Sequence, residues 1–457
     1  MFSPRQLVFL SLFLPCCLLA HPSTAAPSAE DQAVVMLQEP TEAPLYETSA
    51  VALGSWCRYA TSKPALLLLS QNPFLQPVPL KKREQAIELV NSCDPARIVA
   101  EINDDNPDPT ILPNMSVSAA LDAGLFSQLL WVLPIDSSQK QLSAETFHQQ
   151  LVEKGIVNQA EAASFIQNGN ELTGMLHGVP VRVIPLDKLY PLKNSLLVHL
   201  DMSFFPPLYQ NEIKSPLFPL IFQTLHKLRK LEQTPLSVSL SQSNSDGGLP
   251  LTTRFVGSVV QSLFQKPEQL DRQPRLNWQR HRDALYLDNF FKNEETLSLY
   301  QQMEQTETDN PDIKYALYQN LRKLKKGTAA LEKLAEAVAL DPTYALEYLS
   351  LARTAFELIR PDEALRMFDL AMLTFPQNPF IGLQKAELLT TLGQQQAALK
   401  LLRKLRQLSW SDLYYPRVPA HLDRLIEAAQ QPLPHNNIDA VAPATKANGK
   451  TEQTGTN

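Results

Sequence analysis

The sequence predicts a three-layer α/β domain with a mainly parallel sheet, followed by an α-helical solenoid of repeated hairpins. Two observations carry this prediction. Up to about residue 268, short apolar runs without polar alternation are separated by helix-forming stretches, which is the pattern of a parallel sheet buried on both faces. From residue 309 to residue 408 nearly every segment favours a helix, and small and large apolar residues recur every 34 positions.

The composition is that of a globular protein with more than one domain. Of the 457 residues, 44% are hydrophobic and 19% are charged, so each domain can bury a core. A formal net charge of −6 argues against a general nucleic-acid-binding protein, which would carry a basic surplus. We therefore expect no nucleic-acid partner.

Residues 1–25 are predicted to be a signal peptide. Arg5 precedes an apolar run at Leu7–Ala20 that is too short to span a bilayer stably. Small residues at Ser23 and Ala25 suit cleavage after Ala25. The sequence thus predicts an exported protein, periplasmic or extracellular, without stable membrane insertion after cleavage. A retained membrane anchor is the alternative.

The four cysteines divide into two pairs. Cys16 and Cys17 lie within the signal, and the residues before them lack the small side chain of a lipoprotein signal, so acylation is not favoured. Cys57 and Cys93 remain in the exported chain, where they form either a disulfide or two buried thiols. Because no cysteine spacing fits a zinc site, we expect no structural metal and no cofactor.

Residues 26–43 are predicted to form an extended lead and residues 44–268 the α/β domain. The apolar runs predicted to be strands are Leu66–Ser70, Leu129–Leu133, Val181–Ile184, Leu196–Asp201 and Leu236–Leu240. The stretches predicted to be helices are Arg83–Asn91, Ser116–Ala123, Ala144–Lys154, Gln159–Gln167 and Ile213–Leu231. A linking helical region at residues 269–308 then leads to the repeats.

Three hairpins are predicted within residues 309–410, followed by a capping helix within residues 411–430 and a disordered tail at residues 431–457. In the middle hairpin the framework residues are Tyr348, Leu351, Ala352, Ala355, Ala364, Phe368, Ala371 and Pro376. Small residues at these offsets let two antiparallel helices approach closely, and the proline ends the second helix. The region therefore resembles tetratricopeptide repeats, and the resemblance implies a protein or peptide partner held by the repeats.

In a parallel sheet, ligands bind beyond the carboxyl ends of the strands. The polar residues that follow the predicted strands are therefore the candidates for a site. They include Ser70–Asn72, Asp136, His199–Ser203 and Ser241–Gly248. Tyr209 and Glu212 come shortly after the fourth strand and could line the same cleft, or this segment could simply precede and cap a helix.

The α/β region also resembles the arginase/deacetylase-like superfamily, in an uncharacterised branch. Trp131–Pro134, His199–Phe205 and Gly247–Arg254 carry the resemblance. It implies a scaffold for a two-metal hydrolase. However, Leu69–Phe74 offers no carboxylate or imidazole, and Ser203 stands where a second carboxylate would follow Asp201. One carboxylate with neutral oxygens does not hold a catalytic pair of divalent ions, so this chain resembles a member that has lost its metals.

Two interpretations follow for function. The favoured one is an exported, non-catalytic scaffold whose repeats bind a protein or peptide, with the α/β domain as a second binding or structural surface. The alternative is a metal-dependent hydrolase acting on an amide or amidine bond through His199, Asp201, Glu212 and Asp246. On a strand, His199 and Asp201 share one face, so they form either a residual acid–base site or a hydrogen-bonded strand end, and we favour the latter.

Overall fold

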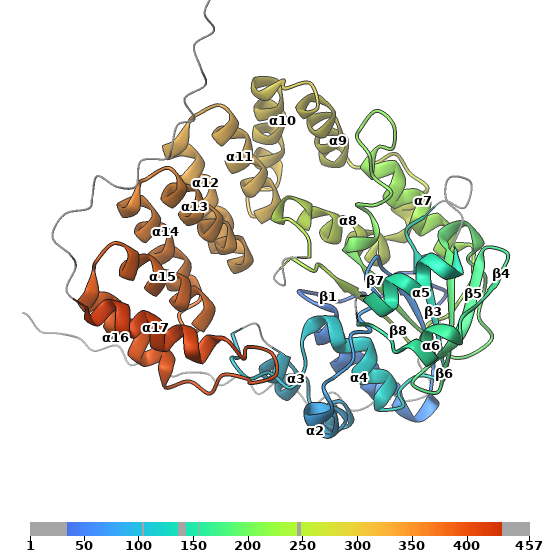
Figure 1. Ribbon diagram of the computed structural model, residues 1–457. Helices are drawn as coiled ribbons and strands as arrows, with labels where there is room; N and C mark the ends of the chain where they lie inside the picture. The colour runs from blue at the N-terminus through green and yellow to red at the C-terminus, as the bar shows by residue number, and fades with distance from the viewer. Residues whose placement is uncertain (1–33, 103–104, 136–142, 154, 245–247, 432–457) are drawn as a thin grey trace, which may run out of the picture. The chain divides into compact units, whose positions relative to one another are not determined.

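The computed structural model describes residues 34–102, 105–135, 143–153, 155–244 and 248–431 (Figure 1). The predicted signal peptide, the tail beyond residue 431, Asp136 and Asp246 lie outside the described residues. Among the helices that are described, none is long and apolar enough to cross a membrane.

Within the described residues, eight strands form one sheet in the order β1-β8-β7-β2-β3-β6-β5-β4. The strands are β1 (Leu45–Tyr46), β2 (Ala65–Leu69), β3 (Gln128–Leu133), β4 (Ile166–Asn168), β5 (Glu171–Leu176), β6 (Val179–Pro185), β7 (Leu196–Asp201) and β8 (Ser237–Ser241). The six neighbouring strands β1, β8, β7, β2, β3 and β6 pair parallel to one another. At one edge of the sheet, β5 pairs antiparallel with both β6 and β4. The predicted mainly parallel sheet is therefore confirmed.

Helices cover both faces of this sheet, because alternate residues of the central strands point to opposite sides. On β2, Leu66 and Leu68 pack into one apolar core while Leu67 and Leu69 pack into the other. The first face is covered by α1 (Leu53–Trp56), α2 (Leu80–Ser92), α3 (Pro95–Ile102), α4 (Ser116–Asp122), α5 (Ala144–Glu153) and α6 (Gln159–Ala163). The second face is covered by α7 (Leu217–Arg229) and α8 (Arg254–Gln265), which completes the three layers (Figure 1).

One predicted helix is too long. The stretch Gln159–Gln167 forms a helix only to Ala163, and Ile166 then begins β4. Asn158 caps the start of this helix and Glu161 completes the capping box. The helix that follows is nevertheless only about one turn long. Pairing with β5 fixes the following residues as an edge strand instead.

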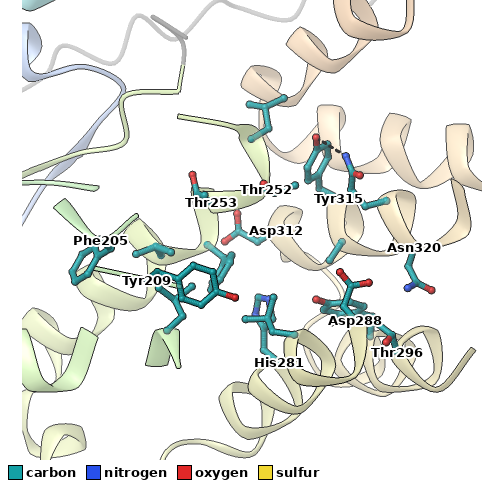
Figure 2. A pocket seen from close by; sticks show the side chains of 18 of the residues that line it. Phe205, Tyr209, Thr252, Thr253, His281, Asp288, Thr296, Asp312, Tyr315 and Asn320 are labelled. Atoms are coloured by element: carbon teal, nitrogen blue, oxygen red, sulfur yellow. Dashed lines mark hydrogen bonds between the residues drawn. The ribbon is translucent and has the colours of Figure 1, made fainter. Parts of the chain in front are cut away.

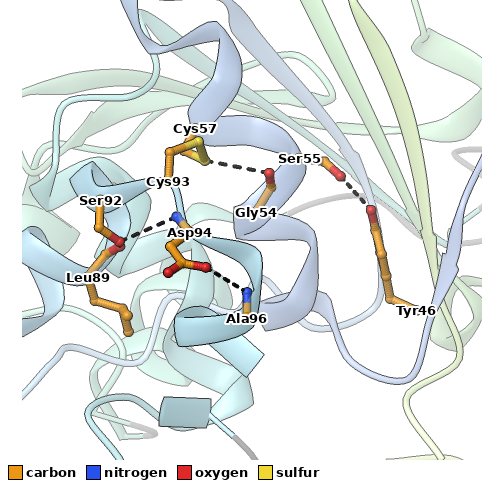
Figure 3. The surroundings of a disulfide bond; sticks show 9 residues. All are labelled: Tyr46, Gly54, Ser55, Cys57, Leu89, Ser92, Cys93, Asp94 and Ala96. Carbon is orange, nitrogen blue, oxygen red and sulfur yellow. Dashed lines mark hydrogen bonds between the residues drawn. A yellow bond between two sulfur atoms is a disulfide. The ribbon is translucent and has the colours of Figure 1, made fainter. Parts of the chain in front are cut away.

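Two restraints tie the beginning of the described chain to the domain. Met36 and Leu37 are fully buried in the second core, and the Met36 amide donates to the carbonyl of Gln233 at 2.9 Å. On the opposite face, a disulfide joins Cys57 to Cys93, with their Cα atoms 5.5 Å apart (Figure 3). It links the short helix after α1 to the end of α2, so of the two alternatives for these cysteines the structure has the bridge.

The second half of the chain is a run of helices packed against their neighbours (Figure 1). They are α9 (Leu276–Asp288), α10 (Asn293–Thr306), α11 (Pro311–Lys323), α12 (Gly327–Leu340), α13 (Leu346–Glu357), α14 (Pro361–Thr374), α15 (Pro379–Thr391), α16 (Gln395–Arg406) and α17 (Val418–Gln430). The second helices of successive hairpins, α10, α12, α14 and α16, each begin 34 residues after the previous one. The hairpin of α9 and α10, which lies in the predicted linking region, thus shares the spacing of the three hairpins after it.

The same period appears in the turn of each hairpin. Phe291, Lys325, Ile359 and Gly393 all have φ between 58° and 69°, and they also lie 34 residues apart. In each turn the amide of the following residue donates to a carbonyl five residues back, as Gln394 does to Leu389 at 2.9 Å. This is the Schellman ending, which usually has glycine in the left-handed position. Only the last hairpin has glycine there.

Ile359 is therefore strained, because a β-branched residue rarely adopts a left-handed conformation. Its side chain is 68% exposed and contributes little packing. We expect Ile359→Gly to raise the free energy of unfolding by about 1 kcal/mol, measured by denaturant titration. The matched control is Leu358→Gly, whose φ of −85° is ordinary. This control should lower the free energy of unfolding, and a similar change in both variants would contradict the assignment of strain.

Candidate functional site

The structure brings His199 and Asp201 together at the carboxyl end of β7, both with no exposed surface. Ser241 joins them, because its hydroxyl donates to Asp201 and lies 3.0 Å from Nε2 of His199. Since the Ser241 proton is used on Asp201, we assign the ring proton to Nε2 of His199, and Nδ1 then accepts from Ser239 at 2.9 Å. Both ring nitrogens are thus satisfied.

Asp201 is held by a second set of donors. Its Oδ1 accepts from the Ser203 amide at 2.9 Å, and its Oδ2 accepts from the hydroxyls of Ser241 and Ser243. Burial raises the pKa of Asp201 above its ordinary value, and these hydrogen bonds oppose that rise. The Ser203 hydroxyl lies 3.2 Å from that of Ser70, so the ends of β2 and β7 meet through a hydrogen bond. This cluster is a closed polar network.

Of the other two residues of the hydrolase interpretation, only Glu212 is described, and it forms no hydrogen bond with this network. Glu212 is buried after β7, and its Oε1 accepts from the Leu217 amide at 3.3 Å, at the start of α7. Burial raises the pKa of Glu212. Asp246 lies outside the described residues. Across the residues that the structure describes, no group of three or more His, Cys, Asp or Glu side chains is arranged to hold a metal ion.

Burial lowers the pKa of His199 to about 3. In the unfolded chain an imidazole titrates near pH 6.5. Below this pH the His199 side chain binds a proton in the unfolded state but stays neutral in the folded state. The contribution of His199 to stability is therefore complete above about pH 6.5 and is lost as the pH falls towards 3, by at most about 1.4 kcal/mol per pH unit.

We expect the difference in unfolding free energy between wild type and His199→Asn to shrink as the pH falls from 7.5 to 4.5. Asp201 and the buried His281 titrate in both proteins, so their effects largely cancel in this difference. Chemical denaturation at a series of pH values measures it. A difference that stays constant over this range would show that His199 is not held neutral by burial.

A cavity of about 340 Å³ lies beside this network, between the α/β domain and the first two hairpins, and we call it the shared cavity. The α/β domain contributes the segment after β7, with Phe205 and Tyr209, and the residues that lead into α8, with Thr253. Opposite them, side chains of α9, α10 and α11 complete the lining (Figure 2). Its volume is at the small end of ligand pockets.

Arg254, the first residue of α8, fixes the two sides of the shared cavity. It is 5% exposed and donates two hydrogen bonds of 2.8 Å to the carboxylate of Glu47, which follows β1. The same guanidinium donates to Asp341, before α13, at 2.6 Å. Burial opposes the charge of Arg254, but Glu47 and Asp341 outweigh it and raise the pKa of Arg254. The ion pairs thus join β1, α8 and the helical repeats.

Asp312 forms a second connection on the wall of the cavity. It lies in the first turn of α11, and its Oδ1 accepts from the Tyr344 hydroxyl at 2.6 Å. Its Oδ2 accepts from Ser258 of α8 at 2.8 Å. Burial raises the pKa of Asp312, and the hydrogen bonds from Tyr344 and Ser258 oppose that rise. Asp312 therefore holds α11 against α8 next to Arg254.

Three polar side chains of the cavity wall are left without hydrogen bonds to described residues. Both amide atoms of Asn320 are buried and unpartnered. The ring of His281 is 7% exposed and contacts Phe255 and Tyr300, with centroids 4.1 Å and 5.5 Å away, and no hydrogen bond to it is found in the described part of the chain. The same holds for the Tyr300 hydroxyl. Burial lowers the pKa of His281 to about 3, so the imidazole is neutral at physiological pH.

Sequence reasoning found only half of this cavity. It pointed to the segment after β7, and Tyr209 does line the cavity. It missed His281 and Thr296, because residues 269–308 were predicted to be a linking region, and it missed Asn320, which lies on α11 within the predicted repeats. The left-handed turn at Phe291, one period before that at Lys325, marks an additional hairpin, but it is a feature of the backbone and not of the sequence.

No known protein-family model matches the chain, and no curated protein sequence is significantly similar to it.

Proposed function

We propose that the protein is an exported, non-catalytic scaffold whose tetratricopeptide-like hairpins bind a protein or peptide beside a degenerate arginase-like α/β domain. The observation that carries this proposal is the shared cavity, which is lined in part by helices of the first two hairpins and mainly by apolar and aromatic side chains. Unpaired hydrogen-bonding groups in such a wall suit a ligand that supplies the missing partners.

The repeat extends this cavity into a binding face along the hairpins. On α11 the cavity is lined by residues one helical turn apart, including Tyr315, Gln319 and Lys323. Because the hairpins repeat every 34 residues, the equivalent residues of α13 and α15 occupy the same face. These residues are Leu349, Arg353 and Glu357 on α13, and Leu383, Glu387 and Thr391 on α15. We call the nine residues the array face.

The array face combines apolar and charged side chains. The row from Tyr315 is continued by two leucines, whereas the next row carries Arg353 and Glu387, and Glu387 pairs with His421 of α17. Arg353 is exposed and stands at the centre of the face. An apolar row beside the exposed charge of Arg353 is suited to an extended or helical peptide segment with its own apolar residues.

The network around Asp201 supports a structural role for the α/β domain. In a hydrolase, a general acid or base needs contact with substrate. Here His199 and Asp201 use their polar atoms on neighbouring serines and have no exposed surface. Serine hydroxyls at the strand ends thus take the place that carboxylates and imidazoles would fill in the family that the sequence resembles.

Arg353→Glu tests the proposal. We expect at least a tenfold loss of the proteins recovered with the tagged, exported protein from its native cell, because the charge at the centre of the array face is reversed. Quantitative mass spectrometry of the recovered material gives the measurement. The matched control is Arg403→Glu, an exposed arginine on the second helix of the last hairpin, which should leave recovery unchanged. Equal recovery with all three proteins would contradict binding at the array face.

A further inference from the structure

We infer that the shared cavity holds a phenol or indole side chain, a tyrosine or tryptophan of the protein partner, through hydrogen bonds to His281 and Asn320. This inference rests on the proposed function, because it names the side chain by which the array face holds its partner. The identity of the occupant is argued from the cavity itself, its buried unpartnered groups and the surrounding charges, and not from the array face.

The walls favour a flat apolar group. Phe255 and His281 have ring centroids 4.1 Å apart at a tilt of 43°, and Phe205 and Tyr209 supply further aromatic surface. In Figure 2, Tyr209 and His281 lie below Asp312, and Asp288 and Asn320 lie to the right of His281. Aromatic pairs prefer edge-to-face or offset contacts, which rings at several inclinations offer to an inserted ring. A volume of about 340 Å³ accommodates a side chain more readily than a large cofactor.

The charged groups in the wall are already paired, so the cavity favours an uncharged occupant. The carboxylate of Asp288 forms an ion pair with Lys323. Asp312 is hydrogen-bonded by Tyr344 and Ser258. A ligand carrying a net charge would have to compete with these pairs in a largely apolar environment, at the cost of its own desolvation.

The polar groups specify a hydrogen-bonding edge on the occupant. Asn320 is 2% exposed, with neither amide atom partnered, and His281 keeps a neutral ring without a hydrogen bond to described residues. A buried donor or acceptor left unpaired is costly, so a site built around one rejects an analogue that lacks the matching group. A phenol hydroxyl or an indole N–H supplies this group, whereas a phenyl ring does not.

Binding of p-cresol and toluene to the full exported protein separates these chemistries, because the two molecules differ by one hydroxyl. We expect p-cresol to bind wild type at least tenfold more tightly than toluene at pH 7.5, measured by ligand-observed NMR. In Asn320→Leu and in His281→Phe the ratio of the affinities for p-cresol and toluene should fall towards one. The matched control, Asn91→Leu, changes an exposed amide on α2 and should keep the preference. Thermal unfolding verifies that each variant is folded, and the two variants test the inference separately should one fail to fold.

N-acetyl-tyrosinamide distinguishes a partner's side chain from a free phenol. We expect it to bind wild type at least as tightly as p-cresol and to lose affinity in Asn320→Leu. Binding of p-cresol with exclusion of N-acetyl-tyrosinamide would overturn the assignment to a partner's side chain. Equal binding of toluene and p-cresol, or binding of neither, would overturn the inference altogether. Neither result depends on Arg353, so the test of the array face stands or fails separately.

Discussion

The position of the helical repeats depends on the buried charge of Arg254. Its guanidinium is shared between Glu47, which follows the first strand, and Asp341, which precedes α13, and it also lies over the ring of Tyr344 at 5.6 Å. The Nη groups of Arg254 are paired, although its buried Nε has no partner among the described residues, and removal of one member of such a charged group leaves uncompensated charge. Segments about 200 and 90 residues away in sequence are thus held at one point, because arginine's fork of donors can satisfy two carboxylates at once.

The shared cavity follows from this constraint. Its floor comes from α8 and the segment after β7, and its opposite wall comes from hairpins that Arg254 and Asp312 hold in place. A second set of contacts lies at the far end of the repeats, where the Ser411 amide donates to the carbonyl of Pro107 at 2.9 Å and the Tyr414 hydroxyl to that of Thr110 at 3.1 Å. A cavity between two elements keeps its shape only if both are restrained, and paired contacts of this kind provide the preorganisation that binding sites need.

The sequence predicted the central strands because β2, β3 and β7 are nearly uninterrupted apolar runs, which a doubly covered sheet requires. It missed β4 and β5, whose mixed polarity and short length carry little signal at a sheet edge. It also missed the first hairpin as a repeat, because Thr296 replaces the alanine found at positions 330, 364 and 398. In the candidate site, the residues after β7 could be predicted, because ligands bind beyond the carboxyl ends of parallel strands. The opposite wall was not, since contacts such as that of Arg254 with Asp341 depend on the tertiary fold and leave no local pattern.

The central claim is that the α/β domain and the helical repeats form one cooperative body through Arg254. Differential scanning calorimetry tests it most directly, since a two-state transition has equal calorimetric and van't Hoff enthalpies. The account predicts one transition for wild type and for the exposed control Arg403→Met. It predicts a lower, split transition for Arg254→Met, because loss of the buried cation costs on the order of 3 kcal/mol and uncouples the two parts. Two independent transitions in wild type, or an Arg254→Met profile identical to that of wild type, would contradict it.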